Sequence, residues 1–143
     1  MKLVKASEVD FQFPVIGFSR EDGLIGFDDV QVMSRCHPAL IEREAFIGME
    51  LVDTSLRRWL VRSLEIAKPL AQKKRWWQIF DSAPWPEFEL LLESAPPVGF
   101  DELKQRFISE TVIEEPDDDE AMRAAPDLAT LVKESYMQCS GFL

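Results

Sequence analysis

Histidine and cysteine are scarce in this sequence of 143 residues, which contains one histidine, His37, and two cysteines, Cys36 and Cys139. A structural zinc site needs about four His or Cys ligands, and histidine is the commonest general base in catalysis. A disulfide scaffold would be shorter and richer in cysteine. The scarcity therefore disfavours zinc binding, histidine-dependent catalysis and a disulfide framework, and we expect both cysteines to be reduced thiols.

Long apolar runs are also lacking. The N-terminus reaches charged residues within a few positions, unlike a secretory signal, and no run approaches the roughly 20 apolar residues that span a bilayer. Because 46% of the residues are hydrophobic and 29% are charged, the composition is that of a globular protein. We expect a soluble, cytoplasmic protein that folds as a single domain over residues 1–143, without a membrane span.

Motifs that bind phosphate, metal or cofactors are missing as well. The repeated Ile-Gly-Phe around Gly17 and Gly26 has neither the GxGxxG spacing nor the GK[ST] ending of phosphate loops. Residues 117–119 are three consecutive aspartates, which do not match the alternating ligands of a calcium loop. There is no HExxH motif or nucleophile elbow, so the sequence predicts no cofactor and no catalytic residues.

The charge that is present is unevenly distributed along the chain. Residues 1–86 contain 12 basic and 12 acidic residues, whereas residues 87–143 contain 4 and 14, which accounts for the whole net charge of −10. Within the neutral part, residues 57–75 have a net charge of +6. The two segments either lie against each other or are solvated separately, as in ordinary surface electrostatics, or they form opposed patches that attract partners of opposite charge.

The apolar pattern predicts an α+β fold with a small antiparallel sheet. Residues 14–18 and 24–27 flank a polar loop ending in Asp-Gly and predict a hairpin, which residues 30–33 could extend. Residues 87–93 alternate apolar and acidic positions, so we expect a strand whose glutamates line a solvated edge. A short middle helix is predicted from Pro38 to Phe46, before Gly48.

Residues 55–68 fit two structures. As strands, residues 50–53 and 57–66 form a hairpin, with Trp59 and Val61 on one face and Leu60, Leu64 and Ile66 on the other. As a helix beginning at Ser55, the same segment places its apolar residues on one stripe and its charged residues opposite. The β-prone residues before the Asp-Thr-Ser turn favour the hairpin, and the helix remains the alternative.

The remainder of the chain is helical and acidic. Residues 1–95 are expected to form mainly the sheet and residues 96–143 two helices, one from Phe100 to Val112 and one opening at Pro126. The intervening residues 114–120 are interpreted as a mobile acidic link.

Two sets of residues are candidates for binding. The first set could bind a basic partner and consists of Glu114, Glu115, Asp117, Asp118, Asp119 and Glu120. The second set could bind an anion and consists of Arg57, Arg58, Arg62, Lys73, Lys74 and Arg75. Basic residues beside tryptophans are typical of single-stranded nucleic acid binding, but an isoelectric point of about 4.6 disfavours contact with phosphate backbones.

Two functional hypotheses follow from these sets. The first is a noncatalytic intracellular interaction protein, such as an immunity or adaptor protein, whose acidic C-terminal region binds another protein with a basic surface. The second is a small ligand-binding domain or enzyme with an anion-binding cleft formed by the central arginines and the tryptophans Trp59, Trp76, Trp77 and Trp85. The pattern leaves the oligomeric state open.

Overall fold

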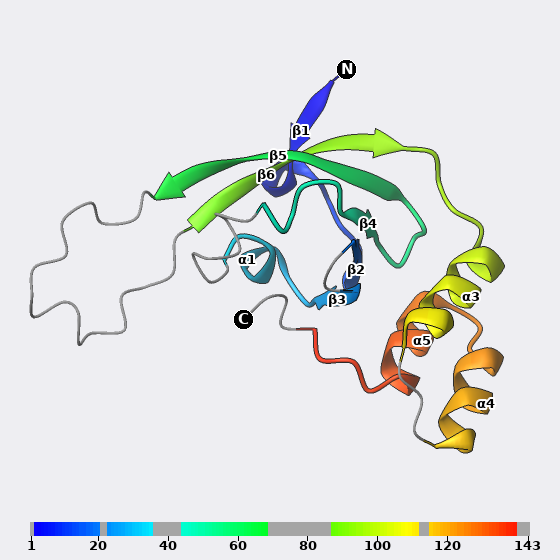
Figure 1. Cartoon of the computed structure of the whole chain (residues 1–143). Helices are drawn as coiled ribbons and strands as arrows, with labels where there is room; N and C mark the ends of the chain where they lie inside the picture. Colours follow the sequence, from blue (N-terminus) through cyan, green and yellow to red (C-terminus); the bar gives the residue numbers. More distant parts are fainter. Residues whose placement is uncertain (1, 21–22, 36–43, 69–86, 112–114, 140–143) are drawn as a thin grey trace, which may run out of the picture.

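The computed structural model describes residues 2–20, 23–35, 44–68, 87–111 and 115–139. Within these residues, six strands form one antiparallel sheet in the order β1-β6-β5-β4-β2-β3 (Figure 1). The strands are β1 (Leu3–Lys5), β2 (Val15–Ser19), β3 (Gly23–Phe27), β4 (Glu50–Val52), β5 (Arg58–Lys68) and β6 (Glu87–Ala95). The helices are η1 (Ala6–Glu8), α1 (Val30–Met33), α3 (Phe100–Glu110), α4 (Pro116–Ala124) and α5 (Leu128–Glu134). The predicted α+β class with an antiparallel sheet is confirmed.

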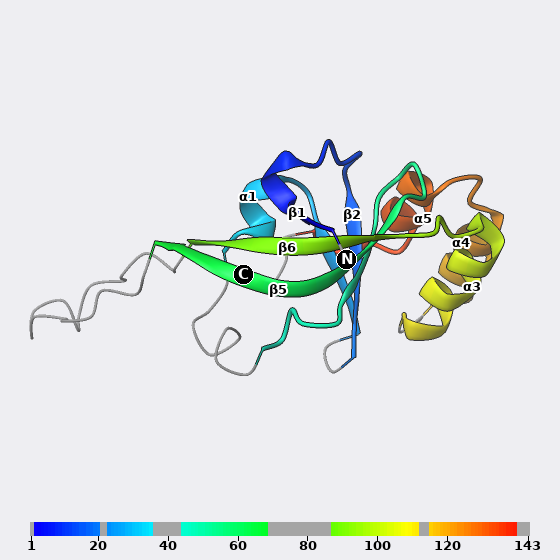
Figure 2. The same cartoon turned by 90° about the horizontal axis from the view of Figure 1, so that it is seen from above.

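Both faces of the sheet are covered where β2 runs through it. Val15 packs into a first apolar cluster with side chains of β5 and β6, whereas Ile16 and Phe18 pack into a second cluster with α3, α4 and α5. The two views of the chain agree that these three helices gather at one end of the sheet (Figures 1 and 2). Burial on both faces explains why β2 and β3 are almost continuously apolar, since a strand with one wet face would alternate.

The hairpin of β4 and β5 confirms the strand interpretation of residues 58–66. Leu51 pairs with Trp59 across the two strands. However, β5 has a bulge at Arg62, because Val61 pairs with Leu92 and Ser63 already pairs with Leu91. The extra residue reverses the alternation of side chains, so Leu64 packs with the first cluster beside Trp59 and Val61. The predicted placement of Leu64 on the opposite face was therefore wrong.

Strand β6 lies inside the sheet and not at its edge. It pairs with β5 on one side and with the short strand β1, which the apolar pattern did not reveal, on the other. Its acidic side chains have partners: Glu87 pairs with Arg35 at 3.0 Å, and Glu89 accepts hydrogen bonds from the Ser7 amide and hydroxyl. The expectation of a solvated edge was wrong, because β1 and the residues after it, 82 positions away in sequence, cover this side of β6.

Residues 30–33 form helix α1 and do not extend β3. The Asp29 carboxylate accepts a hydrogen bond from the Val32 amide at 2.9 Å, which is the side-chain cap that begins a helix. The strand extension was wrong because this cap outweighs the local apolar alternation. Most of the predicted middle helix lies outside the described residues, and its described end, residues 44–46, belongs to a turn over residues 44–48.

The acidic stretch forms a helix from Pro116 onward, so the described C-terminal residues form three helices. The prediction of a mobile link over residues 114–120 was therefore wrong for residues 116–120. Pro116 begins α4, and Asp117, Asp118 and Asp119 occupy its first turn. Proline is favoured at that position, and negative side chains there interact favourably with the helix dipole. Arg123 pairs with Asp119 one turn later at 3.0 Å. The same carboxylates that suggested a solvated link thus stabilise a helix.

Lys104 of α3 joins the end of α4 to the helical layer. Its ammonium donates hydrogen bonds to the carbonyls of Arg123 and Ala125, at 2.9 and 2.8 Å, and lies 5.0 Å from the ring centre of Phe100. Carbonyls at a helix C-terminus lack partners within the helix, and a positive charge there is favourable. One side chain therefore both caps α4 and holds it against α3.

Replacing Lys104 with methionine should lower the free energy of unfolding by about 1–3 kcal/mol, since two charge-assisted hydrogen bonds are lost while the apolar stem is kept. Lys2, which is exposed near the start of the chain, supplies a matched control, and Lys2→Met should change stability by less than about 0.5 kcal/mol. Urea unfolding curves of the three proteins would measure the difference. Equal stability of the two variants would contradict the capping role.

Candidate functional site

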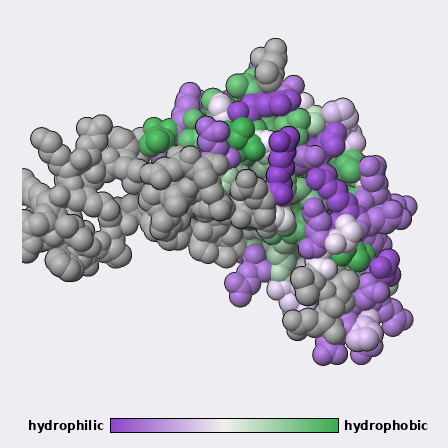
Figure 3. All heavy atoms as spheres, in the orientation of Figure 1, coloured by the Kyte–Doolittle hydropathy of each residue, from purple (hydrophilic) through white to green (hydrophobic). Residues whose placement is uncertain are grey.

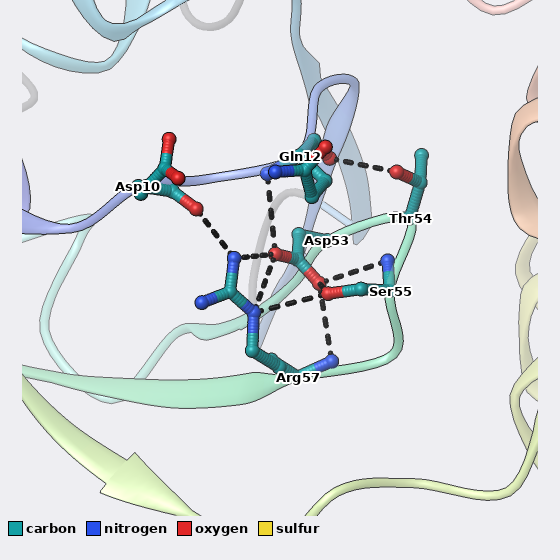
Figure 4. A network of polar contacts seen from close by, with 6 residues as sticks. All are labelled: Asp10, Gln12, Asp53, Thr54, Ser55 and Arg57. Carbon is teal, nitrogen blue, oxygen red and sulfur yellow. Dashed lines mark hydrogen bonds and ion pairs between the residues drawn. The ribbon is translucent and has the colours of Figure 1, made fainter.

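A buried carboxylate organises the turn between β4 and β5 (Figure 4). Asp53 is fully buried, and its Oδ1 accepts hydrogen bonds from the amides of Ser55 and Arg57 and from the Ser55 hydroxyl. Its Oδ2 accepts one from the Gln12 amide at 3.2 Å. Thr54 also donates its amide and hydroxyl to the Gln12 carbonyl, both at 3.0 Å. The turn is thereby tied to the segment that leads into β2.

The guanidinium of Arg57 neutralises this carboxylate. Its Nη2 lies 2.8 Å from Asp53 Oδ2, and it also donates a hydrogen bond to the Asp10 carbonyl. The group lies 5.1 Å from the ring centre of Trp59, within cation–π distance. Most donors of Arg57 are thus directed at its own fold, which leaves this candidate anion-binding residue little capacity for a ligand.

The other two described arginines of β5 also face carboxylates of the sheet. Arg58 lies 3.7 Å from Glu50 of β4, and Arg62 lies 2.5 Å from Glu93 of β6. The Nε atom of Arg58 is buried and has no hydrogen-bond partner among the described residues. The described part of the basic segment therefore pairs with the sheet and its turn, and none of these three ion pairs involves an acidic residue of α4.

A cleft of about 340 Å³ opens where α3 crosses the ends of the strands. Its lining residues come from β2, the residues after it, β4, β5 and α3, and they are Phe18, Ser19, Arg20, Gly48, Glu50, Leu60, Arg62, Arg106 and Glu110. Of the candidate anion-binding residues, the cleft includes Arg62. Trp59 is buried in the first cluster, on the other face of β5 from Leu60 and Arg62, so it does not line this cleft.

Two further arginines, absent from the sequence-based candidates, line the same cleft. Arg106 pairs with Glu50 at 2.9 Å and places its guanidinium 4.1 Å from the ring centre of Phe18. Arg20 lies over Gly48. A β-carbon added to Gly48 would be 3.7 Å from the guanidinium carbon of Arg20. Gly48 has a φ of +82°, a conformation that glycine adopts without strain. Arg106 and Glu50 are 56 positions apart, so no local pattern could have revealed them.

The acidic candidates lie at the surface of α4 and just before it. Glu115, Asp117 and Glu120 are exposed, and Asp118 and Asp119 are partly exposed. Figure 3 shows hydrophilic residues over this helical end of the molecule. Asp119 has a basic partner in Arg123, and no ion pair is formed by the other four within the described ranges. These carboxylates therefore retain most of their charge at the surface.

Several sequence-based candidates fall outside the described residues. They are Cys36, His37, Lys73, Lys74, Arg75, Trp76, Trp77, Trp85 and Glu114. Their proposed roles stay predictions. Cys139 is described and is a free thiol, and burial, followed by the charge and hydrogen bond of Asp28, raises its pKa. A raised pKa keeps the thiol protonated and poorly nucleophilic at neutral pH.

Comparison of the chain with protein-family models, with curated proteins and with solved structures found no match. A functional assignment therefore rests on its own side chains. No three His, Cys, Asp or Glu residues of the described ranges are grouped so that they could hold a metal ion. No helix in the described part of the chain is long and apolar enough to cross a membrane.

The buried carboxylate yields a stability prediction. Asp53→Asn should lower the free energy of unfolding by about 3–5 kcal/mol, because the neutral amide cannot accept all the former hydrogen bonds and leaves Arg57 without its counter-charge. Asp10→Asn makes the same chemical change in the same network, where only the backbone carbonyl of Asp10 is used, and should have an effect below about 0.5 kcal/mol. Chemical denaturation would measure both variants. A loss of unfolding free energy below about 1 kcal/mol for Asp53→Asn, which is typical of ordinary substitutions, would contradict the structural role of Asp53.

Proposed function

We propose that this protein is a noncatalytic interaction module of the immunity or adaptor type, whose acidic helix α4 binds the basic surface of another protein. The observation that supports the proposal is the separation of charge in the fold. Arg57, Arg58 and Arg62 are directed at carboxylates of the sheet and its turn, so they do not neutralise α4. These arginines therefore do not neutralise the negative charge of the acidic helix.

The local environment of α4 supports the same proposal. Lys104, the lysine nearest the end of α4, directs its ammonium to backbone carbonyls, and Arg106 is directed away to Glu50. Arg123 compensates Asp119 alone. The exposed carboxylates of Asp117 and Glu120 therefore remain available to a partner. The net charge of the whole protein is −10, which adds to the attraction of a basic partner.

Such an acidic surface favours association with a basic protein through complementary charge. Complementary charge raises the rate of encounter and sets the orientation of docking, while like-charged partners are repelled. The rigid scaffold of a helix holds the carboxylates in a fixed pattern, which a mobile link would not do, and reduces the entropy lost on binding. We place this binding in the cytoplasm, the compartment in which a free thiol such as Cys139 stays reduced.

The test is a triple variant, Asp117→Asn with Asp118→Asn and Glu120→Gln, used as bait in lysate of the source cells. The wild-type protein should capture at least one basic protein, identified by mass spectrometry, that the variant loses. For the purified pair we expect the variant to bind at least about tenfold more weakly at low ionic strength, with a smaller difference at high salt.

The matched control neutralises three exposed carboxylates elsewhere, through Glu8→Gln, Asp10→Asn and Glu65→Gln. Because it changes the net charge by the same amount, it distinguishes a local surface from a general effect of charge. The control should retain the partner with an affinity close to that of the wild type. The same set of captured proteins on all three baits would overturn the proposal.

A further inference from the structure

The cleft between the sheet and α3 has the size of a site for a small molecule and is about half open to solvent. Its volume of about 340 Å³ lies at the lower end of the range for ligand pockets. The walls are formed by four segments that are distant in sequence, and none of its lining residues belongs to the acidic surface of α4. It is therefore a second surface, independent of the proposed protein-binding helix.

Three guanidinium groups converge on this cleft. Arg20 has no ion pair within the described ranges and is exposed, so its five donors are available. Arg62 bonds Glu93 through Nε, which leaves its terminal nitrogens available for another acceptor. Arg106 is held in place by Glu50 and by the ring of Phe18. Planar guanidinium groups bind carboxylates through paired hydrogen bonds, and this preference is stronger where the group is already oriented.

The remaining lining residues restrict the charge and the shape of a ligand. The carboxylates at the cleft are Glu50 and Glu110, and Glu93 pairs with Arg62 beside it. Because Arg58 also lies 3.7 Å from Glu50, four arginines stand against three carboxylates, and a monoanion balances the one positive charge in excess better than a dianion does. Leu60, which is partly exposed, supplies an apolar surface beside the cations, whereas the ring of Phe18 is buried beneath the guanidinium of Arg106. The ligand class that fits both features is a carboxylate attached to a small apolar or aromatic body.

We propose that the cleft lined by Arg20, Arg62 and Arg106 binds a small apolar carboxylate, with the carboxylate group on the guanidinium groups and the apolar body against Leu60. The contact needs no metal and no covalent step. Glu110 lies at the cleft and repels a bound anion, so it lowers the affinity. The three arginines and Glu110 thus have opposite effects on the same equilibrium.

The probe for this proposal is benzoate, titrated into the isotopically labelled full chain and followed by two-dimensional NMR. We expect saturable shifts at the backbone amides of Ser19, Leu60 and Arg106. Arg20→Gln should weaken benzoate binding at least about tenfold, as expected for loss of a charged hydrogen bond, whereas Glu110→Gln should tighten it about threefold. Both residues are exposed, so neither substitution should alter the melting temperature.

Arg35→Gln is the matched control, because Arg35 pairs with Glu87 and does not line the cleft. It should leave benzoate affinity unchanged. Acetate, which lacks the apolar body, should bind more weakly, and benzamidine, the cationic counterpart, should not shift the same signals. An absence of saturable shifts at about 10 mM benzoate, equal weakening by Arg35→Gln, or tighter binding of the dianion phenyl phosphate would overturn the proposal.

Discussion

The buried carboxylate of Asp53 is the interaction on which the rest of the sheet depends. It fixes the turn between β4 and β5 and also holds the segment before β2, so two parts of the chain that are about 40 residues apart meet at one side chain. A buried charge is costly unless it is paired and hydrogen bonded, and Arg57 supplies the pairing while backbone amides supply the bonds. With the turn fixed, β5 is placed between β4 and β6 and the curved sheet can enclose its first apolar cluster.

Arginine has the same role elsewhere in the described part of the chain. Arg57, Arg58 and Arg62 face Asp53, Glu50 and Glu93 of the sheet and its turn. These ion pairs do not involve α4, whose described carboxylates other than Asp119 keep their charge at the surface. The two proposed binding surfaces are consequences of this arrangement. One is an acidic helix that these arginines do not neutralise, and the other is a cleft between the sheet and α3, where four arginines stand against three carboxylates.

The errors of the sequence-based interpretation have specific physical causes. The cap at Asp29 explains helix α1, and Pro116 with the acidic first turn explains helix α4. Both signals are visible in the sequence. The interpretation instead followed the apolar alternation at α1 and the density of charge at α4. The reversed face of Leu64 has another cause. A bulge at Arg62 leaves no local signature, because it is defined by the register against β6.

The sequence by itself determined the α+β class and the concentration of negative charge in the C-terminal part, and it favoured the hairpin over β4 and β5 without excluding a helix. Local periodicity, turn residues and counts of charge are properties of neighbouring positions. Only the tertiary structure decided which charges neutralise each other. Arg106 meets Glu50 across 56 positions, and Arg20 and Arg62 line the same cleft because their strands belong to one sheet. Contacts of this kind depend on strand order and register, and so the cleft could not be predicted from the sequence.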